Sequence, residues 1–294
     1  MKKHAYLIMA HHDFSLLQKL LLLLDDPHND LYLHIDKKSD KSMFENVSLQ
    51  YSNLYIIPSI SVNWGGHSQI RCELNLLKSA IPNKYTYYHL LSGADLPIKS
   101  NKYIQDFFEH NAGKEFLIAN KISLENNNLE ILNRIKYYYF FQNTIGRNGG
   151  KLMRIFEILE VLSIQLQKCF KVDRIKNNNL EYYKGGNWFS ITHNLATFLI
   201  ANEDKIKHIF SKTVCADELF LQTFAMQSPY KDNIVCDNNL RCIDWQRGKP
   251  YTFRLEDFDL LMSSDKLFAR KFSTTTDSNI IHKIYNSLYS KKSN

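Results

Sequence analysis

The chain has 294 residues, of which 44% are hydrophobic and 13% aromatic, so it is long and apolar enough to bury a sizeable core and is not a disordered chain. Its formal net charge is +7 at pH 7, which is compatible with an anionic ligand, an anionic membrane surface or a nucleic acid. Because neither a recognition motif nor a concentrated basic stripe accompanies this charge, we expect no nucleic-acid partner.

The sequence shows no pattern typical of a membrane-spanning helix, a signal peptide, a disulfide framework or a zinc site. A membrane-spanning helix needs roughly 18 or more uncharged apolar residues, and the densest apolar run, 20–24, is bracketed by charges. The N-terminus leads directly into a strand pattern without the apolar region or cleavage site of a signal peptide, so we expect a cytoplasmic location. The five cysteines form no C-x-x-C pair, which argues against a disulfide framework and a zinc site: Cys72, Cys169, Cys215, Cys236 and Cys242.

The first 120 residues alternate short apolar runs with helical patterns, which predicts an α/β protein whose mainly parallel sheet is covered by helices on both faces. The expected strands are 5–10, 31–36, 54–57, 85–91 and 116–119. The expected helices are 16–24, 68–80 and 103–108, with a polar helix between the second and third strands.

The second half is less regular. We expect loops at the Asn-rich stretches 126–128 and 177–179, with a long helix between them at 152–170. Two short strands are expected at 233–236 and 240–245, and a final helix at 279–288. No internal repeat or linker divides the chain, so the sequence predicts a single domain over residues 1–294.

Polar clusters follow three of the predicted strands, at the edge of a parallel sheet where ligands bind. No G-x-G-x-x-G or P-loop follows them, which excludes a dinucleotide-binding fold and a phosphate-cradling NTPase. Two adjacent histidines are poor evidence for a metal-chelating pair. The clusters are His11-His12-Asp13, Asp36-Lys37-Lys38 and Ser92-Gly93-Ala94-Asp95.

Two adjacent carboxylates, Asp217 and Glu218, are predicted to open an amphipathic helix. Unpaired N–H groups and the macrodipole at a helix start favour ionised carboxylates. An ionised and partly exposed carboxylate can serve as a general base. The alternative is that Asp217 caps the helix and Glu218 only belongs to its first turn.

Five sequence blocks, 34–38, 88–99, 185–189, 217–218 and 268–272, resemble in order and spacing those of the core-2/I-branching enzyme family. The blocks S-G-x-D-x-P-I-K and F-A-R-K-F are the most specific, and the resemblance extends from about residue 4 to 285. That family comprises β-1,6-N-acetylglucosaminyltransferases and peptide O-xylosyltransferases. The resemblance implies a GT-A fold, a UDP-sugar donor, inversion at the anomeric carbon and no metal cofactor. It also implies a nucleotide-binding half, 1–120, and an acceptor and catalytic half, 121–294.

By this resemblance, Glu218 is the catalytic base. An inverting transfer needs one carboxylate that takes the acceptor hydroxyl proton while the oxygen attacks opposite the leaving nucleotide. Asp217 shares a helical stripe with Phe220, Leu221 and Phe224, so we expect it to face the scaffold as the cap, whereas Glu218 is rotated off that stripe.

The diphosphate leaving group needs positive charge, and the family supplies it with basic side chains. Lys271 occupies the matching position in the last block, and a second cation is expected in 245–250. Either Arg247 or Lys249 could serve; Lys249 is preferred because Pro250 restricts its backbone to an extended conformation. For each, the alternative is an ordinary solvated surface charge.

A literal D-x-D sequence, Asp257-Phe258-Asp259, occurs late in the chain. Most GT-A enzymes use such a motif to hold a divalent cation. Because this one begins a predicted helix, we interpret it as a helix-start element and predict no metal site.

The nucleoside is expected beside the first two strands, where Ala10, His11 and Asp36 match positions near the uridine. Ser92 stands where the animal branching enzymes carry a free cysteine near the donor pocket. For Asp95, the expected role is to tie its loop together through hydrogen bonds to the backbone.

On the acceptor side, Trp245 matches an aromatic residue, although a core tryptophan is an alternative. Arg134 lies in a stretch, 133–138, that falls in the acceptor-binding region. The donor sugar is left open, with N-acetylglucosamine and xylose as the leading candidates. The acceptor linkage and the oligomeric state are also left open.

The sequence therefore predicts an inverting, metal-independent glycosyltransferase that serves bacterial surface polysaccharide synthesis. Its acceptor would be a lipid-linked glycan, and the +7 charge would favour peripheral contact with the anionic inner leaflet. The alternative is a non-catalytic nucleotide- or glycan-binding protein on the same scaffold. The presence of both Glu218 and Lys271 favours the enzyme.

Overall fold

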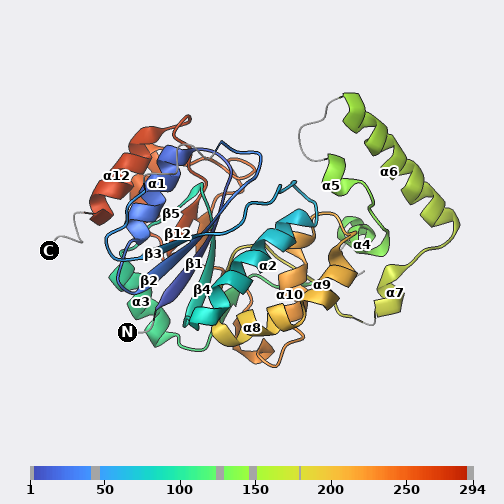
Figure 1. Cartoon of the computed structure of the whole chain (residues 1–294), viewed down its shortest axis with the longest axis horizontal. Coiled ribbons are helices and arrows are strands. Elements are labelled where there is room, and N and C mark those ends of the chain that lie inside the picture. Colours follow the sequence, from blue (N-terminus) through green and yellow to red (C-terminus); the bar gives the residue numbers. More distant parts are fainter. Residues whose placement is uncertain (1–2, 41–46, 124–128, 146–150, 179, 290–294) are drawn as a thin grey trace.

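A seven-stranded sheet with the order β10-β6-β9-β4-β1-β2-β3 forms the centre of the protein (Figure 1). The computed structural model describes residues 3–40, 47–123, 129–145, 151–178 and 180–289. Strands β4, β1, β2 and β3 are parallel, as are β10 and β6, whereas β9 is antiparallel to both of its neighbours. The predicted mainly parallel α/β class is confirmed. The strands are β1 (His4–Ala10), β2 (Asn29–Ile35), β3 (Asn53–Ile56), β4 (Tyr87–Ser92), β6 (Glu115–Leu117), β9 (Phe189–Thr192) and β10 (Ile234–Val235).

Helices cover both faces of this sheet (Figure 1). Side chains alternate along β1, so that Ala5 and Leu7 pack into one core while Tyr6 and Ile8 pack into the other. The first core includes α2 (Ser68–Ala80), α8 (His193–Ala201), α9 (Glu203–Phe210) and α10 (Phe220–Ala225). The second includes α1 (Phe14–Leu24), α3 (Asn101–His110), α11 (Phe258–Ser263) and α12 (Ser278–Tyr289).

A smaller sheet joins the end of β4 to the C-terminal part of the chain. Strand β12 (Phe268–Arg270) lies between β11 (Arg241–Ile243), to which it is parallel, and β5 (Asp95–Pro97), to which it is antiparallel. Because β5 follows β4 directly, this sheet brings the segments after β11 and β12 to the carboxyl ends of the central strands. A two-stranded ribbon is formed by β7 (Asn120–Lys121) and β8 (Tyr183–Lys184).

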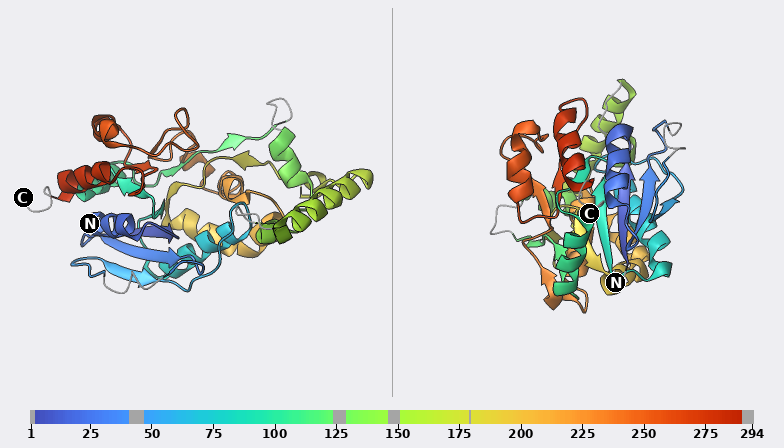
Figure 2. Two further views of the ribbon diagram at one scale, coloured as in Figure 1. Left: turned by 90° about the horizontal axis from the view of Figure 1, so that it is seen from above. Right: turned by 90° about the vertical axis from the view of Figure 1, so that its left-hand side faces the viewer.

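A group of helices at one end of the molecule stands apart from the sheet. These helices are α4 (Leu129–Lys136), α5 (Gln142–Ile145), α6 (Lys151–Cys169) and α7 (Arg174–Asn178). Helix α6 extends away from the sheet at the end opposite to α12 (Figure 1, Figure 2). None of the helices in the described part of the chain combines the length and apolar character that a membrane crossing requires.

Some details of the predicted secondary structure were wrong, whereas the predicted polar helix stays a prediction. The described residues around the predicted polar helix, 37–40 and 47–53, form no helix, and 41–46 lie outside the described residues. Helix α7 includes two residues of the expected Asn-rich loop at 177–179, while residues 126–128 lie outside the described ranges. Strands β5 and β9 were not predicted, because both are short and take their hydrogen bonds from segments distant in sequence.

Candidate active site

Asp217 and Glu218 lie in a short 3-10 helix, Ala216–Glu218, that precedes α10. The preceding residue, Cys215, has a left-handed backbone (φ 49°), and its N–H donates to the carbonyl of Gly65 at 2.8 Å. The side chain of neither carboxylate caps this turn or α10. The prediction that the carboxylate pair opens an α-helix, with Asp217 as its cap, is therefore wrong.

The Glu218 carboxylate lies beside a guanidinium. The Arg134 Nη1 donates to Glu218 Oε2 at 3.4 Å, while Arg134 Nη2 donates to Glu130 Oε1 at 2.7 Å. About half of the Glu218 side chain, 53%, is exposed. Partial burial raises the pKa of Glu218, and the charges of Arg134 and Lys184 oppose that rise. The structure thus brings the predicted base and a predicted acceptor-side residue together at an accessible position.

Asp217 points away from solvent, toward α2. It is buried, and its Oδ2 accepts a hydrogen bond from Gln69 Nε2 at 3.1 Å. Burial, with a smaller contribution from Glu218, raises the pKa of Asp217 from 3.8 to about 7. On the same helix, Glu73 is fully buried, and burial together with the charge of Asp217 raises its pKa well above the usual range. The expected ionisation of Asp217 at a helix start is therefore opposed by its burial.

This burial predicts a pH-dependent effect of Asp217→Asn. An acid whose folded pKa is raised makes the protein less stable as pH increases, here between about 4 and about 7. The neutral amide can still accept from Gln69 and does not titrate. Relative to wild type, the variant should therefore gain unfolding free energy by on the order of a few kcal/mol between pH 4 and pH 8. Denaturant unfolding at both pH values measures this, and a pH-independent difference would contradict it.

The Gly-Gly turn of the block 185–189 passes directly beside the Glu218 turn. The Gly185 N–H donates to the carbonyl of Glu218 at 3.0 Å, and Gln222 Nε2 donates to the carbonyl of Gly186 at 2.7 Å. A Cβ at Gly185 would lie 1.8 Å from the carbonyl oxygen of Ile118, so only glycine fits there. Gly185 therefore allows the backbone to pass close to Ile118 while its N–H holds the Glu218 turn.

Asp95 and Ser92 form a buried network with Arg270. Asp95 is fully buried and accepts from the Ser92 N–H at 2.8 Å, the Ser92 hydroxyl at 2.8 Å and Arg270 Nη1 at 3.0 Å. The same Arg270 nitrogen donates to Ser92 Oγ at 2.9 Å, and its guanidinium lies 4.3 Å from the centre of the Trp188 ring. These contacts join the loop after β4 to β12. They also occupy the Ser92 hydroxyl, which donates to Asp95 and accepts from Arg270.

The predicted nucleoside residues lie together at the ends of β1 and β2. The Asp36 N–H donates to the carbonyl of Ala10 at 2.9 Å. Asp36 is buried and accepts from the N–H groups of Lys38 at 2.9 Å and Val62 at 3.2 Å. His11 follows Ala10 directly at this edge. Asp36 therefore organises the loop at this edge, and its contact with a nucleoside stays a prediction.

Lys271 lies next to the same edge. Partial burial lowers the pKa of His11 to about 4, with smaller contributions from the charges of His12 and Lys271. Four residues beyond β12, the hydroxyl and N–H of Thr274 each donate to Asp13 at 2.8 Å, which fixes this segment to the loop between β1 and α1. The F-A-R-K-F block thereby places the Lys271 cation beyond the carboxyl end of β1, and its contact with a diphosphate stays a prediction.

The two candidates for the second cation differ in their surroundings. Arg247 is held by two carboxylates, Asp244 at 2.6 Å and Asp257 at 2.8 Å, and lies 4.0 Å above the ring of Tyr251. Lys249 is exposed and forms no hydrogen bond or ion pair with any residue that the structure describes. All donors of the Lys249 ammonium are therefore open to a phosphate, whereas in Arg247 the Nε and Nη1 groups are occupied by carboxylates and Nη2 remains.

The loop that carries these cations lies beside Lys271. The Tyr251 N–H closes it by donating to the carbonyl of Asp244 at 2.9 Å, and the Lys271 N–H donates to the carbonyl of Tyr251 at 3.4 Å. Trp245 on this loop is 64% exposed, which excludes the alternative of a core tryptophan. In the described part of the chain, no hydrogen bond or ion pair connects Trp245 to Glu218.

Asp257 belongs to a helix start. Its Oδ2 accepts from the N–H of Arg254 at 2.8 Å, in the 3-10 turn Leu255–Asp257 that leads into α11. Its other oxygen is bound to Arg247. Within the described ranges, no three His, Cys, Asp or Glu side chains gather as metal ligands.

Most of the chain, residues 4–261, matches the model of a known protein family, the Core-2/I-Branching enzyme family. The chain belongs to this family. The GT-A assignment comes with the family, and the central sheet with its flanking helices is the α/β architecture expected for it.

Members of xylosyltransferase families are among the chain's relatives. Xylosyltransferase 2 of Rattus norvegicus is 24% identical over 310 residues, 94% of this chain. Xylosyltransferase sqv-6 of Caenorhabditis elegans is 24% identical over 283 residues, 85% of this chain. The chain spans 32% of the length of each. The crystal structure of mouse xyloside xylosyltransferase 1 covers 92% of this chain and aligns over 97% of its own length, with 11% identity and a TM-score of 0.38.

Three residues of this core-2/I-branching site were not predicted: Glu130, Gln69 and Glu73. Glu130 and Arg134 are four residues apart on α4, a spacing that could have indicated their ion pair. Gln69 and Glu73 belong to α2 and contact the Glu218 turn only through the tertiary fold, for which the sequence carries no local signal.

Proposed function

We propose that the chain is an inverting glycosyltransferase that moves a sugar from a UDP-sugar to a glycan hydroxyl, with Glu218 as the general base. The observation that carries this proposal is the half-exposed Glu218 carboxylate, 3.4 Å from Arg134 in the family's catalytic block. In the reaction, Glu218 takes the acceptor hydroxyl proton, the acceptor oxygen bonds to the anomeric carbon, and the bond to the diphosphate breaks on the opposite face. The electron pair of that bond leaves with the diphosphate.

The surroundings of Glu218 suit this role. Partial burial raises its pKa and makes the carboxylate a stronger proton acceptor, while Arg134 limits the rise and keeps the ionised form available. Arg134, which binds the same carboxylate, has further N–H groups that could donate to an acceptor sugar hydroxyl.

On the donor side, we assign the diphosphate to Lys271 and Lys249, whose ammonium groups would stabilise the charge that develops on the leaving oxygen. The nucleoside would lie along Ala10, His11 and Asp36. Xylose and N-acetylglucosamine are the favoured donor sugars, and xylose is supported by relatives that are named xylosyltransferases. Turnover of the purified protein against a panel of nucleotide sugars tests this. Nucleotide binding without transfer or hydrolysis of any sugar would favour a non-catalytic binding protein.

The proposed cation site predicts that activity survives saturating EDTA. The reason is that Lys271 and Lys249 supply the positive charge, while Asp257 of the D-x-D sequence is already bound to Arg247 and to the backbone of Arg254. Initial rates with EDTA, and after readdition of manganese or magnesium, measure this. Activity lost with EDTA and restored by either metal would contradict the assignment.

The acceptor in this proposal is a lipid-linked glycan of bacterial surface polysaccharide synthesis, met at the inner face of the plasma membrane. The net charge of +7 supports a location near anionic lipid. Transfer to lipid-linked acceptors, compared with soluble oligosaccharides of the same sequence, tests this part separately from the donor.

A further inference from the structure

Helix α6 contacts the rest of the protein through polar side chains and through the ring of Phe156, whose centre lies 5.6 Å from that of Phe141. Glu160 accepts hydrogen bonds from the N–H groups of Phe140 at 3.1 Å and Phe141 at 2.7 Å. Gln167 accepts from the Tyr138 N–H at 2.7 Å and donates to the Tyr138 carbonyl at 2.9 Å. Both side chains are buried, so this polar stripe is the inner face of the helix.

The opposite face of α6 is apolar and exposed. At the helical spacing of about 100° per residue, its large side chains point away from the Glu160 stripe. An ordinary surface helix would turn such a stripe toward the core. We name this set the α6 face, and the exposed fractions of its members lie between 41% and 79%: Ile155, Ile158, Leu159, Leu162, Leu166 and Phe170. A continuous exposed apolar surface of this kind marks a contact site.

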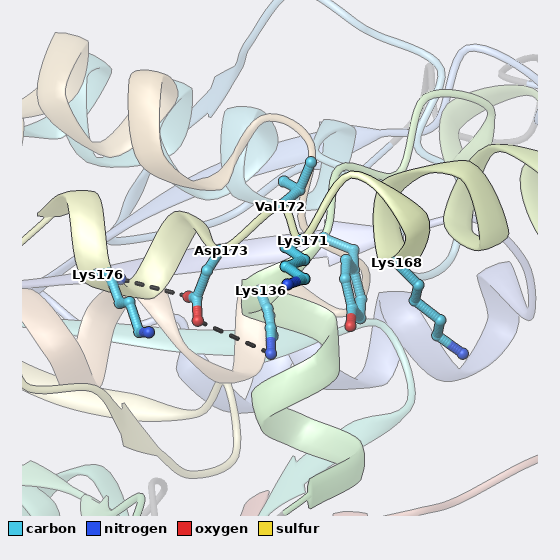
Figure 3. A pocket seen from close by; sticks show the side chains of 7 residues that line it. Lys136, Lys168, Lys171, Val172, Asp173 and Lys176 are labelled. Carbon is cyan, nitrogen blue, oxygen red and sulfur yellow. Dashed lines mark hydrogen bonds and ion pairs between the residues drawn. The ribbon is translucent and has the colours of Figure 1, made fainter.

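A cluster of lysines adjoins the C-terminal end of the α6 face. A pocket of about 590 Å³ has four lysines in its lining, which Figure 3 shows: Lys136, Lys168, Lys171 and Lys176. Its single acidic side chain, Asp173, is 3.7 Å from Lys136 Nζ. The cluster therefore keeps an excess of positive charge, directly beside Phe170, whose side chain is 79% exposed.

We infer that the α6 face and this lysine cluster dock on an anionic lipid membrane, with the apolar side chains in the acyl boundary and the lysines at the headgroup phosphates. An apolar helix face with a lysine cluster at one end combines the two groups by which helices bind at the membrane interface. Charge complementarity favours this occupant, because anionic headgroups offset the excess positive charge of the cluster, whereas the same surface of a second copy carries that same excess.

Helix α4 connects this surface to the candidate active site. Arg134 on α4 contacts Glu218, and two residues later Lys136 lines the lysine pocket. Docking through α6 would therefore hold the acceptor side of the site close to the lipid surface. This consequence rests on the proposed transferase function, whereas membrane binding itself does not.

Sedimentation with vesicles tests the docking. We expect the protein to pellet with vesicles of phosphatidylcholine mixed with phosphatidylglycerol, and about tenfold less with phosphatidylcholine alone or at high salt. The double variant Leu162→Glu/Leu166→Glu should weaken binding to the mixed vesicles by at least about tenfold. Its matched control is Leu255→Glu/Leu260→Glu, which adds the same charges at exposed leucines near α11 and should bind as wild type.

The lysines are tested separately with Lys168→Glu/Lys171→Glu, which should abolish the preference for phosphatidylglycerol. Far-UV circular dichroism and thermal unfolding of all variants confirm that they are folded. Wild-type protein that does not pellet with mixed vesicles, or an α6-face variant that pellets like wild type, would overturn the inference. So would a lipid-independent dimer that the Leu162→Glu/Leu166→Glu variant dissociates. No sugar is present in these assays, so failure of the transferase proposal would show instead in the nucleotide-sugar panel.

Discussion

Glu218→Gln is expected to lower the transfer rate by about 10²–10⁴-fold, the usual contribution of a positioned base, while UDP affinity stays close to that of wild type. The amide keeps the shape of the side chain and can still accept a hydrogen bond from Arg134, but it cannot take the acceptor proton. Because the diphosphate is assigned to lysines on other loops, donor binding should not depend on this carboxylate. Steady-state kinetics and UDP titration on the same preparation measure both quantities.

The matched control is Glu130→Gln. Glu130 is the other carboxylate bound to Arg134, and its side chain is 84% exposed. Its loss should change turnover by less than about tenfold, since an exposed ion pair contributes little. If Glu218→Gln retains activity within about tenfold of wild type, or if Glu130→Gln is the more damaging change, then Glu218 is not the base.

Most of the central sheet could be predicted from the sequence, because its strands and helices carry their own hydrophobic periodicity. The pattern of α2, predicted at 68–80, coincides with the observed helix Ser68–Ala80. Strand β9 has only four residues and pairs with β4 and β6, which lie far away in sequence. Its antiparallel insertion depends on that pairing and on the glycine turn before it, so local periodicity could not reveal it.

The candidate site was predictable in its residue types but not in their environments. Asp217 and Glu218 are adjacent in the sequence, so their carboxylates could be recognised as a pair. The burial that raises the pKa of Asp217 could not be predicted, because it involves packing against α2, about 150 residues earlier. Likewise, the choice between Arg247 and Lys249 depends on Asp257, a carboxylate ten residues away that the fold brings to Arg247. Propensity also indicated α6 as a helix, but it could not show that its polar stripe faces the protein.

Lys271→Ala is expected to lower both turnover and UDP affinity. If ammonium groups stand in place of a metal ion, their interaction strengthens as the leaving oxygen gains charge, so part of the loss appears only in the transition state. We expect a cost of about 3 kcal/mol in kcat/KM, or roughly 10²-fold, the size of one lost electrostatic contact in a water-excluded site. The position of Lys271 beyond β1, next to His11 and His12, is the structural reason for this assignment.

The two candidate partners of Lys271 provide the comparison. Lys249→Ala should lower turnover and UDP affinity as Lys271→Ala does. Lys249 is exposed, has no ion pair among the described residues, and lies on the loop whose Tyr251 carbonyl accepts from the Lys271 N–H. Arg247→Ala should leave turnover nearly unchanged and instead loosen the loop, since Arg247 is already bound to Asp244 and Asp257. Kinetics with UDP inhibition, together with thermal unfolding, separate these effects. Wild-type turnover and UDP affinity in Lys271→Ala would place the diphosphate elsewhere, and a large loss confined to Arg247→Ala would make Arg247 the second cation.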